Sequence, residues 1–177
     1  RSSWGTNDAV KASYPPIEPA RILNMWVAEI GGGILGYAQF PGGSPSTDGV
    51  VMSPQYFGDA SASGGGSFYL SAPFNLGRTA THEVGHWMNL RHIWGDGRCR
   101  QDDFVSDTPE SSRPNYGCNL SAANCRSTDM VENYMDYSDD DCMNIFTYDQ
   151  MTRMRTVLET SPIRASLITS DACIPPA

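Results

Sequence analysis

The stretch His82-Glu83-Val84-Gly85-His86-Trp87-Met88-Asn89-Leu90-Arg91-His92 decides how this sequence is interpreted. On an α-helix, residues four apart lie on one face, so His82 and His86 can offer two imidazole nitrogens to one metal ion. His92 can be a third ligand only if the chain turns sharply after the second histidine. Asn89 stands at that turn, and asparagine tolerates the left-handed backbone conformation better than most residues do. Three neutral imidazoles leave one tetrahedral position open for water, as in catalytic zinc sites.

The distribution of histidine supports this interpretation. The chain has 177 residues and three histidines, and all three lie within the quoted stretch. A His-Glu-x-x-His pattern alone also occurs on surface helices that bind nothing. A third histidine, six residues after the second, is spaced so that all three can bind one ion, which favours zinc. Glu83 is then the expected general base, which accepts a proton from zinc-bound water. The alternative for Glu83 is a solvated helix carboxylate.

The composition excludes several classes of protein. Hydrophobic residues make up 40% and aromatic residues 10%, which is typical of a globular chain, and the length predicts one domain over 1–177. The formal net charge of −8 argues against nucleic acid or an anionic membrane as the partner. Because no apolar run has the length of a membrane span, we expect a soluble protein. We also expect a monomer, with an upper half at about 1–88, a lower half at about 89–177, and a cleft between them.

The pattern of apolar and turn-forming residues predicts a small number of regular elements. Residues 1–20 are expected to be irregular, 58–66 to form a Gly/Ser-rich loop, and 93–142 to form a long polar loop. Thr147 and Gln150 have the spacing of a capping box at a helix start. The expected strands are 22–30, 34–40 and 50–52, and the expected helices are 76–89, 147–158 and a short one after Pro162.

The cysteines indicate the compartment. Four of the five cysteines lie in the long loop, where they are expected to form two disulfides in an oxidising, extracellular environment. Reduced thiols or a second zinc site are the alternatives, and the residues alone leave the pairing open. Cys173 is left over. The chain starts at Arg1 without an apolar signal segment, so we expect a mature secreted form that has lost its signal and pro-segment.

The quoted stretch resembles the metzincin signature His-Glu-x-x-His-x-x-Gly-x-x-His, with Asn89 in place of the glycine. Its continuation through 91–96 is similar to the pappalysin family, whose loop after the zinc helix and Met-turn match 105–109 and 133–137 in order. The resemblance covers about 22–158. It implies an α+β metzincin-type catalytic domain with a twisted, mostly parallel sheet, an active-site helix, and a loop-rich C-terminal half that carries a C-terminal helix.

The resemblance also implies roles for particular residues. Met135 would form an apolar floor beneath the zinc, or be ordinary core. Tyr137 would move between the metal and a transition-state hydrogen bond, or be a buried structural tyrosine. The family's spacing implies the disulfides Cys99–Cys125 and Cys118–Cys142.

A calcium site is a further implication. The loop that holds Asp102, Asp103 and Asp107 is rich in oxygen ligands of the kind that calcium accepts. By resemblance, Asp103 and the carbonyl of Thr108 are the expected ligands. The alternative is a solvated acidic loop.

Substrate selection is expected on both sides of the cleft. Asp140 matches the aspartate of Arg-selective family members, which predicts a preference for Arg on the carboxyl side of the scissile bond. Arg1 at the first position fits self-cleavage with that preference. The strand at 34–39 resembles the cleft's upper rim, where Gly33, Leu35 and Gly36 would face an extended substrate. The alternatives are a solvated charge run and a plain sheet strand.

Together, the sequence predicts a secreted zinc endopeptidase that acts on proteins or peptides and binds structural calcium. The competing hypothesis is a catalytically idle, zinc-stabilised protein-binding module, against which the intact Glu83 argues.

Overall fold

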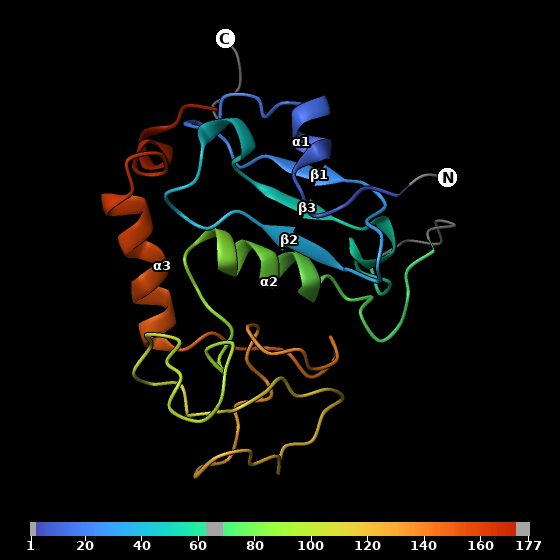
Figure 1. The fold of residues 1–177 in the computed structure, drawn as a ribbon, viewed down its shortest axis with the longest axis vertical. Coiled ribbons are helices and arrows are strands. Elements are labelled where there is room, and N and C mark those ends of the chain that lie inside the picture. The colour runs from blue at the N-terminus through green and yellow to red at the C-terminus, as the bar shows by residue number, and fades with distance from the viewer. Residues whose placement is uncertain (1–2, 63–68, 173–177) are drawn as a thin grey trace.

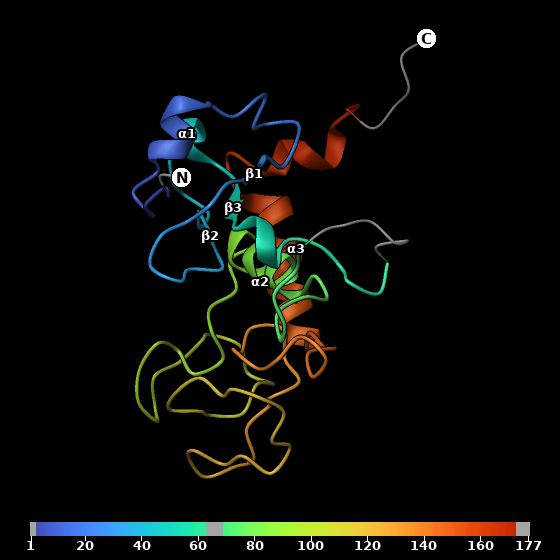
Figure 2. The same cartoon turned by 90° about the vertical axis from the view of Figure 1, so that its right-hand side faces the viewer.

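The computed structural model describes residues 3–62 and 69–172 (Figure 1). A small sheet lies above helix α2, helix α3 stands beside both, and long loops extend below (Figures 1 and 2). Arg1, Cys173 and part of the loop expected at 58–66 lie outside the described residues. The named elements are α1 (Ala9–Ser13), β1 (Met25–Val27), β2 (Gly36–Ala38), β3 (Val50–Met52), α2 (Arg78–Trp87), α3 (Tyr148–Thr160) and short 3₁₀ helices at Pro45–Thr47, Pro54–Tyr56 and Ala165–Thr169.

The sheet is mixed, whereas the expectation was a mostly parallel sheet. Its strand order is β1-β3-β2, in which β1 and β3 run parallel and β2 runs antiparallel to β3. The segment 39–49 joins β2 to β3 without a crossover helix, and such direct connections join antiparallel strands. β1 and β2 are each shorter than the apolar runs that predicted them, because only their central residues pair with β3. The combination of sheet and helices agrees with the expected α+β class.

Helix α1 lies in the N-terminal segment that was expected to be irregular, so that prediction is wrong. The helix has no side-chain hydrogen bond at its N-cap, Asp8. Its buried Val10 packs in one cluster with Ile30 and with Val51 of β3. A helix this short is stabilised by such packing rather than by its own sequence signal.

Helix α2 is shorter at both ends than the predicted 76–89, and residues distant in sequence define its boundaries. At its start, the backbone N–H groups of Leu76 and Arg78 donate to Oδ2 of Asp140, at 2.8 and 3.2 Å. In its middle, a β-carbon on Gly85 would lie 2.5 Å from Sδ of Met135. Any larger residue here would displace the Met135 side chain, so glycine allows the 133–137 segment to pack closely against the helix.

A buried ion pair fixes the other end of α2. Arg164 is 1% exposed and its guanidinium pairs with Asp48, which is 2% exposed. The same guanidinium donates to the carbonyls of Trp87 and Gln39 and lies 4.3 Å from the Trp87 ring. Trp87 Nε1 in turn donates to Asp48 at 3.2 Å. The C-terminal segment is thereby joined to α2 and to the β2–β3 connection.

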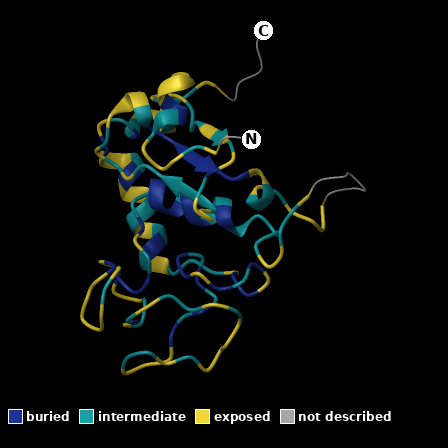
Figure 3. Ribbon diagram, turned by 45° about the vertical axis from the view of Figure 1, so that its right-hand side comes forward, coloured by how far each residue is buried: buried dark blue, intermediate teal, exposed yellow. Residues whose placement is uncertain are grey.

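Below α2, residues 88–147 contain no named helix or strand, in line with the expected loop. The disulfides Cys99–Cys125 and Cys118–Cys142 are both present, as the resemblance implied. A second apolar cluster of Leu90, Ile93, Trp94 and Met135 supports this half. Figure 3 shows buried residues gathered on β3 and α2, and exposed residues along the lower loops.

The two remaining helical predictions are confirmed. α3 starts with the predicted capping box, in which Thr147 and Gln150 bond each other's backbone. A short 3₁₀ helix follows Pro162, at Ala165–Thr169. Within the described residues, no helix combines the length and the apolar character that crossing a bilayer requires.

Replacing Arg164 tests the buried ion pair. Arg164→Met leaves the Asp48 carboxylate buried without its cation, so we expect a loss of about 3–5 kcal/mol in the free energy of unfolding. Urea denaturation followed by tryptophan fluorescence measures this loss. Arg155→Met, on an exposed position of α3, is the control and should change stability by less than about 0.5 kcal/mol. Equal unfolding midpoints for the two variants would contradict the assignment.

Candidate active site

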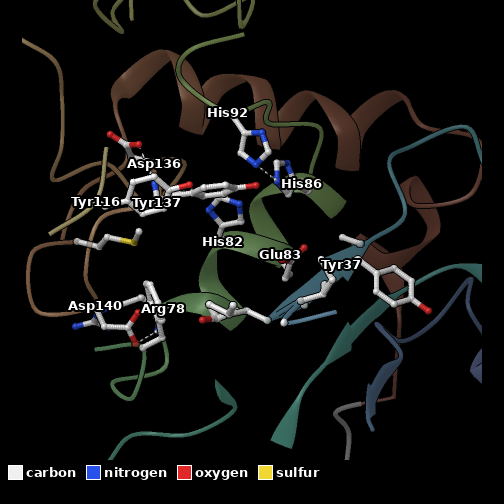
Figure 4. Close-up of a pocket in the computed structure, with 18 residues that line it drawn as sticks. Tyr37, Arg78, His82, Glu83, His86, His92, Tyr116, Asp136, Tyr137 and Asp140 are labelled. Atoms are coloured by element: carbon white, nitrogen blue, oxygen red, sulfur yellow. Dashed lines mark hydrogen bonds between the residues drawn. The ribbon is translucent and has the colours of Figure 1, made fainter. Parts of the chain in front are cut away.

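A pocket of about 530 Å³ opens between β2 and α2 on one side and the 134–143 region on the other (Figure 4). It brings together most of the site residues that the sequence predicted. Its lining consists of residues 33–38, Phe74, Arg78, Thr79, His82, Glu83, His86, His92, Tyr116, Asp136, Tyr137, Asp140 and Met143.

The three histidines converge at the back of this pocket. α2 carries His82 and His86 one turn apart, and Asn89 has φ of 75°, which confirms the predicted left-handed turn. His92 returns so that one ring nitrogen of each histidine lies within 4.8 Å of the others. The Nε2 atoms of His86 and His92 are 3.1 Å apart.

Backbone carbonyls orient the two helical histidines. Nδ1–H of His82 donates to the carbonyl of Tyr134 at 2.7 Å, and Nδ1–H of His86 donates to the carbonyl of Leu90 at 2.8 Å. Because a carbonyl only accepts, each of these rings carries its proton on Nδ1 and a lone pair on Nε2. This is the arrangement by which histidine binds a metal ion through Nε2.

The third histidine is held by side chains instead. His92 Nδ1 bonds the carboxylate of Asp96, and its ring stacks on Trp94 at 4.2 Å between centroids. Tyr137 meets the same ring edge-on at 4.9 Å. Asp96 and Trp94 received no role from the sequence, although an acidic residue four positions after a candidate ligand is a signal of such a partner.

The protonation states of the histidines fit a bound cation. Burial lowers the pKa of all three rings, and it lowers that of His86 to about 4. Near neutral pH, Nε2 of His86 and Nε2 of His92 therefore direct lone pairs at each other across 3.1 Å. Two acceptors at this distance repel unless a cation lies between them, so the donor set suits a metal ion.

Glu83 lies between the three histidines and β2 (Figure 4). It is 6% exposed, and its Oε2 is buried without a hydrogen-bond partner among the described residues. Burial raises the pKa of Glu83 to about 8. A β-carbon on Gly36 would lie 2.9 Å from Cγ of Glu83, so the edge strand packs closely against the aliphatic part of this side chain.

The Met-turn segment, 133–137, contributes to the opposite wall. Met135 is fully buried beneath α2, and Tyr137 is 36% exposed with its ring 5.6 Å from that of His82. Burial, more than the nearby acidic groups, raises the pKa of Tyr137 to about 12. Its phenol therefore stays protonated and can donate a hydrogen bond. The buried carboxylate of Asp136 accepts the Tyr137 N–H at 2.8 Å and so helps to position this residue.

Asp140 lines the pocket but also has a structural task that the sequence did not indicate. Its Oδ2 accepts the two N–H groups at the start of α2, while the described residues place no hydrogen bond on Oδ1. Burial is the main cause that raises its pKa, and the charge of Arg78 opposes this shift. Arg78 and Tyr116 line the same region and had no predicted role.

The expected calcium ligands lie together, but outside this pocket. Asp103 is buried, its Oδ1 accepts the N–H of Val105 at 3.0 Å, and its Oδ2 accepts the hydroxyl of Thr108 at 2.9 Å. Across residues 3–62 and 69–172, no metal-binding group of three His, Cys, Asp or Glu side chains includes Asp103. The calcium site therefore stays a prediction.

Comparison with known proteins identifies relatives of this chain. The M43 peptidase family, described as pregnancy-associated plasma protein-A, matches residues 35–159. An extracellular metalloprotease of Coccidioides posadasii is 42% identical over 138 residues, which is 76% of this chain and 49% of the fungal protein. One from Pyricularia oryzae is 42% identical over 142 residues, or 76% of this chain and 47% of that protein. The chain thus spans about half the length of these curated relatives.

Solved structures of mirolysin share the fold. Mature mirolysin from Tannerella forsythia, in complex with a cleaved peptide, has a TM-score of 0.83 and 39% identity, covering 94% of this chain and 65% of that chain. Mirolysin in complex with a compound has a TM-score of 0.86 and 38% identity, covering 99% of this chain and 69% of that chain. These likenesses confirm the metzincin-type α+β fold that the sequence predicted.

Removing one ligand tests the metal centre without an activity assay. A metal ion at 100 times its dissociation constant stabilises the folded state by about 2.7 kcal/mol, so Zn²⁺ should raise the melting temperature of the chain. We expect His92→Ala to abolish this shift. Tyr116→Ala should keep the shift, because Tyr116 lines the same pocket but is not one of the three histidines. A full zinc-induced shift in His92→Ala would remove His92 from the ligand set.

Proposed function

Because the chain belongs to the M43 peptidase family, the family of the pappalysins, we propose that it is a zinc-dependent endopeptidase. The observation that carries the proposal is the convergence of three neutral imidazoles beside a buried, unpartnered carboxylate in an open pocket. The substrates are proteins or peptides, and the chain works as a monomer. The extracellular relatives and the two disulfides support secretion, with the catalytic chain as the mature form.

His82, His86 and His92 would hold the zinc ion, which when bound supplies a Lewis acid that activates water and polarises the substrate carbonyl. Glu83 is the proton acceptor in this proposal. Its unpartnered Oε2 is available to take a proton from a water in the pocket and then to pass it to the leaving amine nitrogen.

Tyr137 would stabilise the reacting carbonyl oxygen. Its protonated phenol is partly exposed and lies beside two of the ligand rings, so it can donate a hydrogen bond as negative charge develops on that oxygen. Met135 supports the same region from below without taking part in the chemistry.

The substrate would lie in extended form along β2. The sheet order places β2 at an edge, and Gly33, Leu35 and Gly36 line the pocket there. An extended peptide can add to such an edge through backbone hydrogen bonds. Asp140, whose Oδ1 is available, would then select Arg on the carboxyl side of the scissile bond.

A structural calcium site is also part of the proposal. Structural calcium at Asp103 and Thr108 rests on the resemblance, and a calcium ion would compete with the internal hydrogen bonds of Asp103. The alternative function, an idle zinc-stabilised binding module, is disfavoured because the buried Oε2 of Glu83 has no structural partner among the described residues. A carboxylate kept for structure alone is normally hydrogen-bonded.

The Glu83→Gln variant tests the chemical step. Glutamine keeps the volume but cannot accept a proton, so we expect peptide cleavage to fall by at least about 100-fold. Mass spectrometry of the cleavage products from a mixed protein substrate measures this. The zinc-induced rise in melting temperature should persist, which distinguishes loss of the catalytic step from loss of zinc binding. Wild-type turnover in Glu83→Gln would contradict the role of Glu83, and an inactive zinc-loaded wild type would favour the binding module.

The Asp140→Asn variant tests substrate selection. Asparagine keeps an oxygen for the N–H groups at the start of α2 but removes the charge that a substrate guanidinium needs. We expect the preference for Arg over uncharged residues to fall roughly 10- to 100-fold in kcat/KM, as for the loss of a charged hydrogen bond. Asp141→Asn, at an exposed position in the same acidic run, should keep the preference. A peptide library without any preference for Arg in the wild type would refute the assignment.

A further inference from the structure

The turn that separates the second and third histidines contains a backbone conformation that must be held in place. Asn89 has φ of 75°, where a β-carbon crowds the backbone and L-residues are strained. The family signature that this chain resembles has glycine here. A contact from elsewhere in the chain can compensate for the missing glycine.

Arg153 on α3 makes such a contact. Its Nε donates to the carbonyl of Asn89 at 2.7 Å, across 64 residues of sequence. A second nitrogen of the same guanidinium lies 3.4 Å from the carbonyl of Phe104. The guanidinium is also 5.8 Å from the Phe104 ring, which Arg91 approaches from its own position at 4.8 Å. Arg153 therefore joins α3 to the turn and to the loop packed beside it.

The same turn orients two metal ligands. Leu90 follows directly, and its carbonyl accepts Nδ1–H of His86 at 2.8 Å while its N–H donates to Gly85 at 2.9 Å. His92 comes two residues later. A rotation of the peptide between Asn89 and Leu90 would therefore displace both the carbonyl that orients His86 and the chain that carries His92.

From these contacts we infer that Arg153 is a positioning residue of the metal centre. It stabilises the left-handed turn at Asn89 and thereby sets the geometry of His86 and His92 without touching the metal. The inference rests on the proposed zinc site but not on peptidase chemistry. Its test can therefore be read from metal binding alone.

The test compares zinc affinity, measured by competition with a chelating dye, in the wild type, Arg153→Gln and Arg155→Gln. Residues that orient metal ligands typically change affinity by about 10- to 100-fold when mutated, so we expect Arg153→Gln to lose at least about 10-fold. The visible absorption of the Co²⁺-loaded protein should also change, because it reports ligand geometry. Arg155→Gln, exposed on the same helix, should alter neither.

A second pair of variants separates positioning from general stability. Arg153→Lys keeps a charge but cannot bond both carbonyls in one plane, so its zinc affinity should lie below that of the wild type even if Arg153→Gln fails to fold. Asn89→Gly relieves the strain, and in that background Arg153→Lys should lose less affinity.

Wild-type zinc affinity and cobalt spectrum in Arg153→Lys, or an equal loss in Arg155→Gln, would overturn the inference. Failure of the wild type to bind zinc would instead overturn the proposed function.

Discussion

The end of helix α2 is the constraint on which the rest of the structure depends. The three histidines of the short segment 82–92 can converge only if the helix ends soon after His86 and the chain turns back. Two guanidiniums from the C-terminal region bond the carbonyls at this point, Arg164 at Trp87 and Arg153 at Asn89. Positive charge is favourable at a helix C-terminus, where the carbonyls have no partner within the helix. The helix that carries the ligands is thus terminated by residues far along the sequence.

Features that depend on local spacing could be predicted from the sequence. The histidine trio, the left-handed turn at Asn89 and the capping box at Thr147 each follow from residue types a few positions apart. Helix α1, the short strands and the mixed sheet could not be predicted in this way. They depend on long-range packing and pairing, as between Val10 and Val51 of β3, and no periodic pattern encodes those contacts.

In the candidate site, too, some groups could be predicted from the sequence and others could not. The candidate ligands and the candidate general base carry distinctive side chains, so the sequence could indicate them. The groups that orient His82 and His86 are the carbonyls of Tyr134 and Leu90, which any residue type supplies, so they leave no trace in the sequence. Asp140 shows a different difficulty, because its carboxylate both lines the pocket and caps α2. Sequence similarity indicates the first of these tasks and gives no information about the second.

The contact between Gly36 and Glu83 has a consequence for how the two sides of the cleft work together. Because the edge strand lies against the aliphatic part of Glu83, the rim that would align a peptide and the carboxylate that would take the proton share one rigid frame of reference. If the strand and the helix move as one body, small changes in the width of the cleft would leave the scissile bond aligned with Glu83.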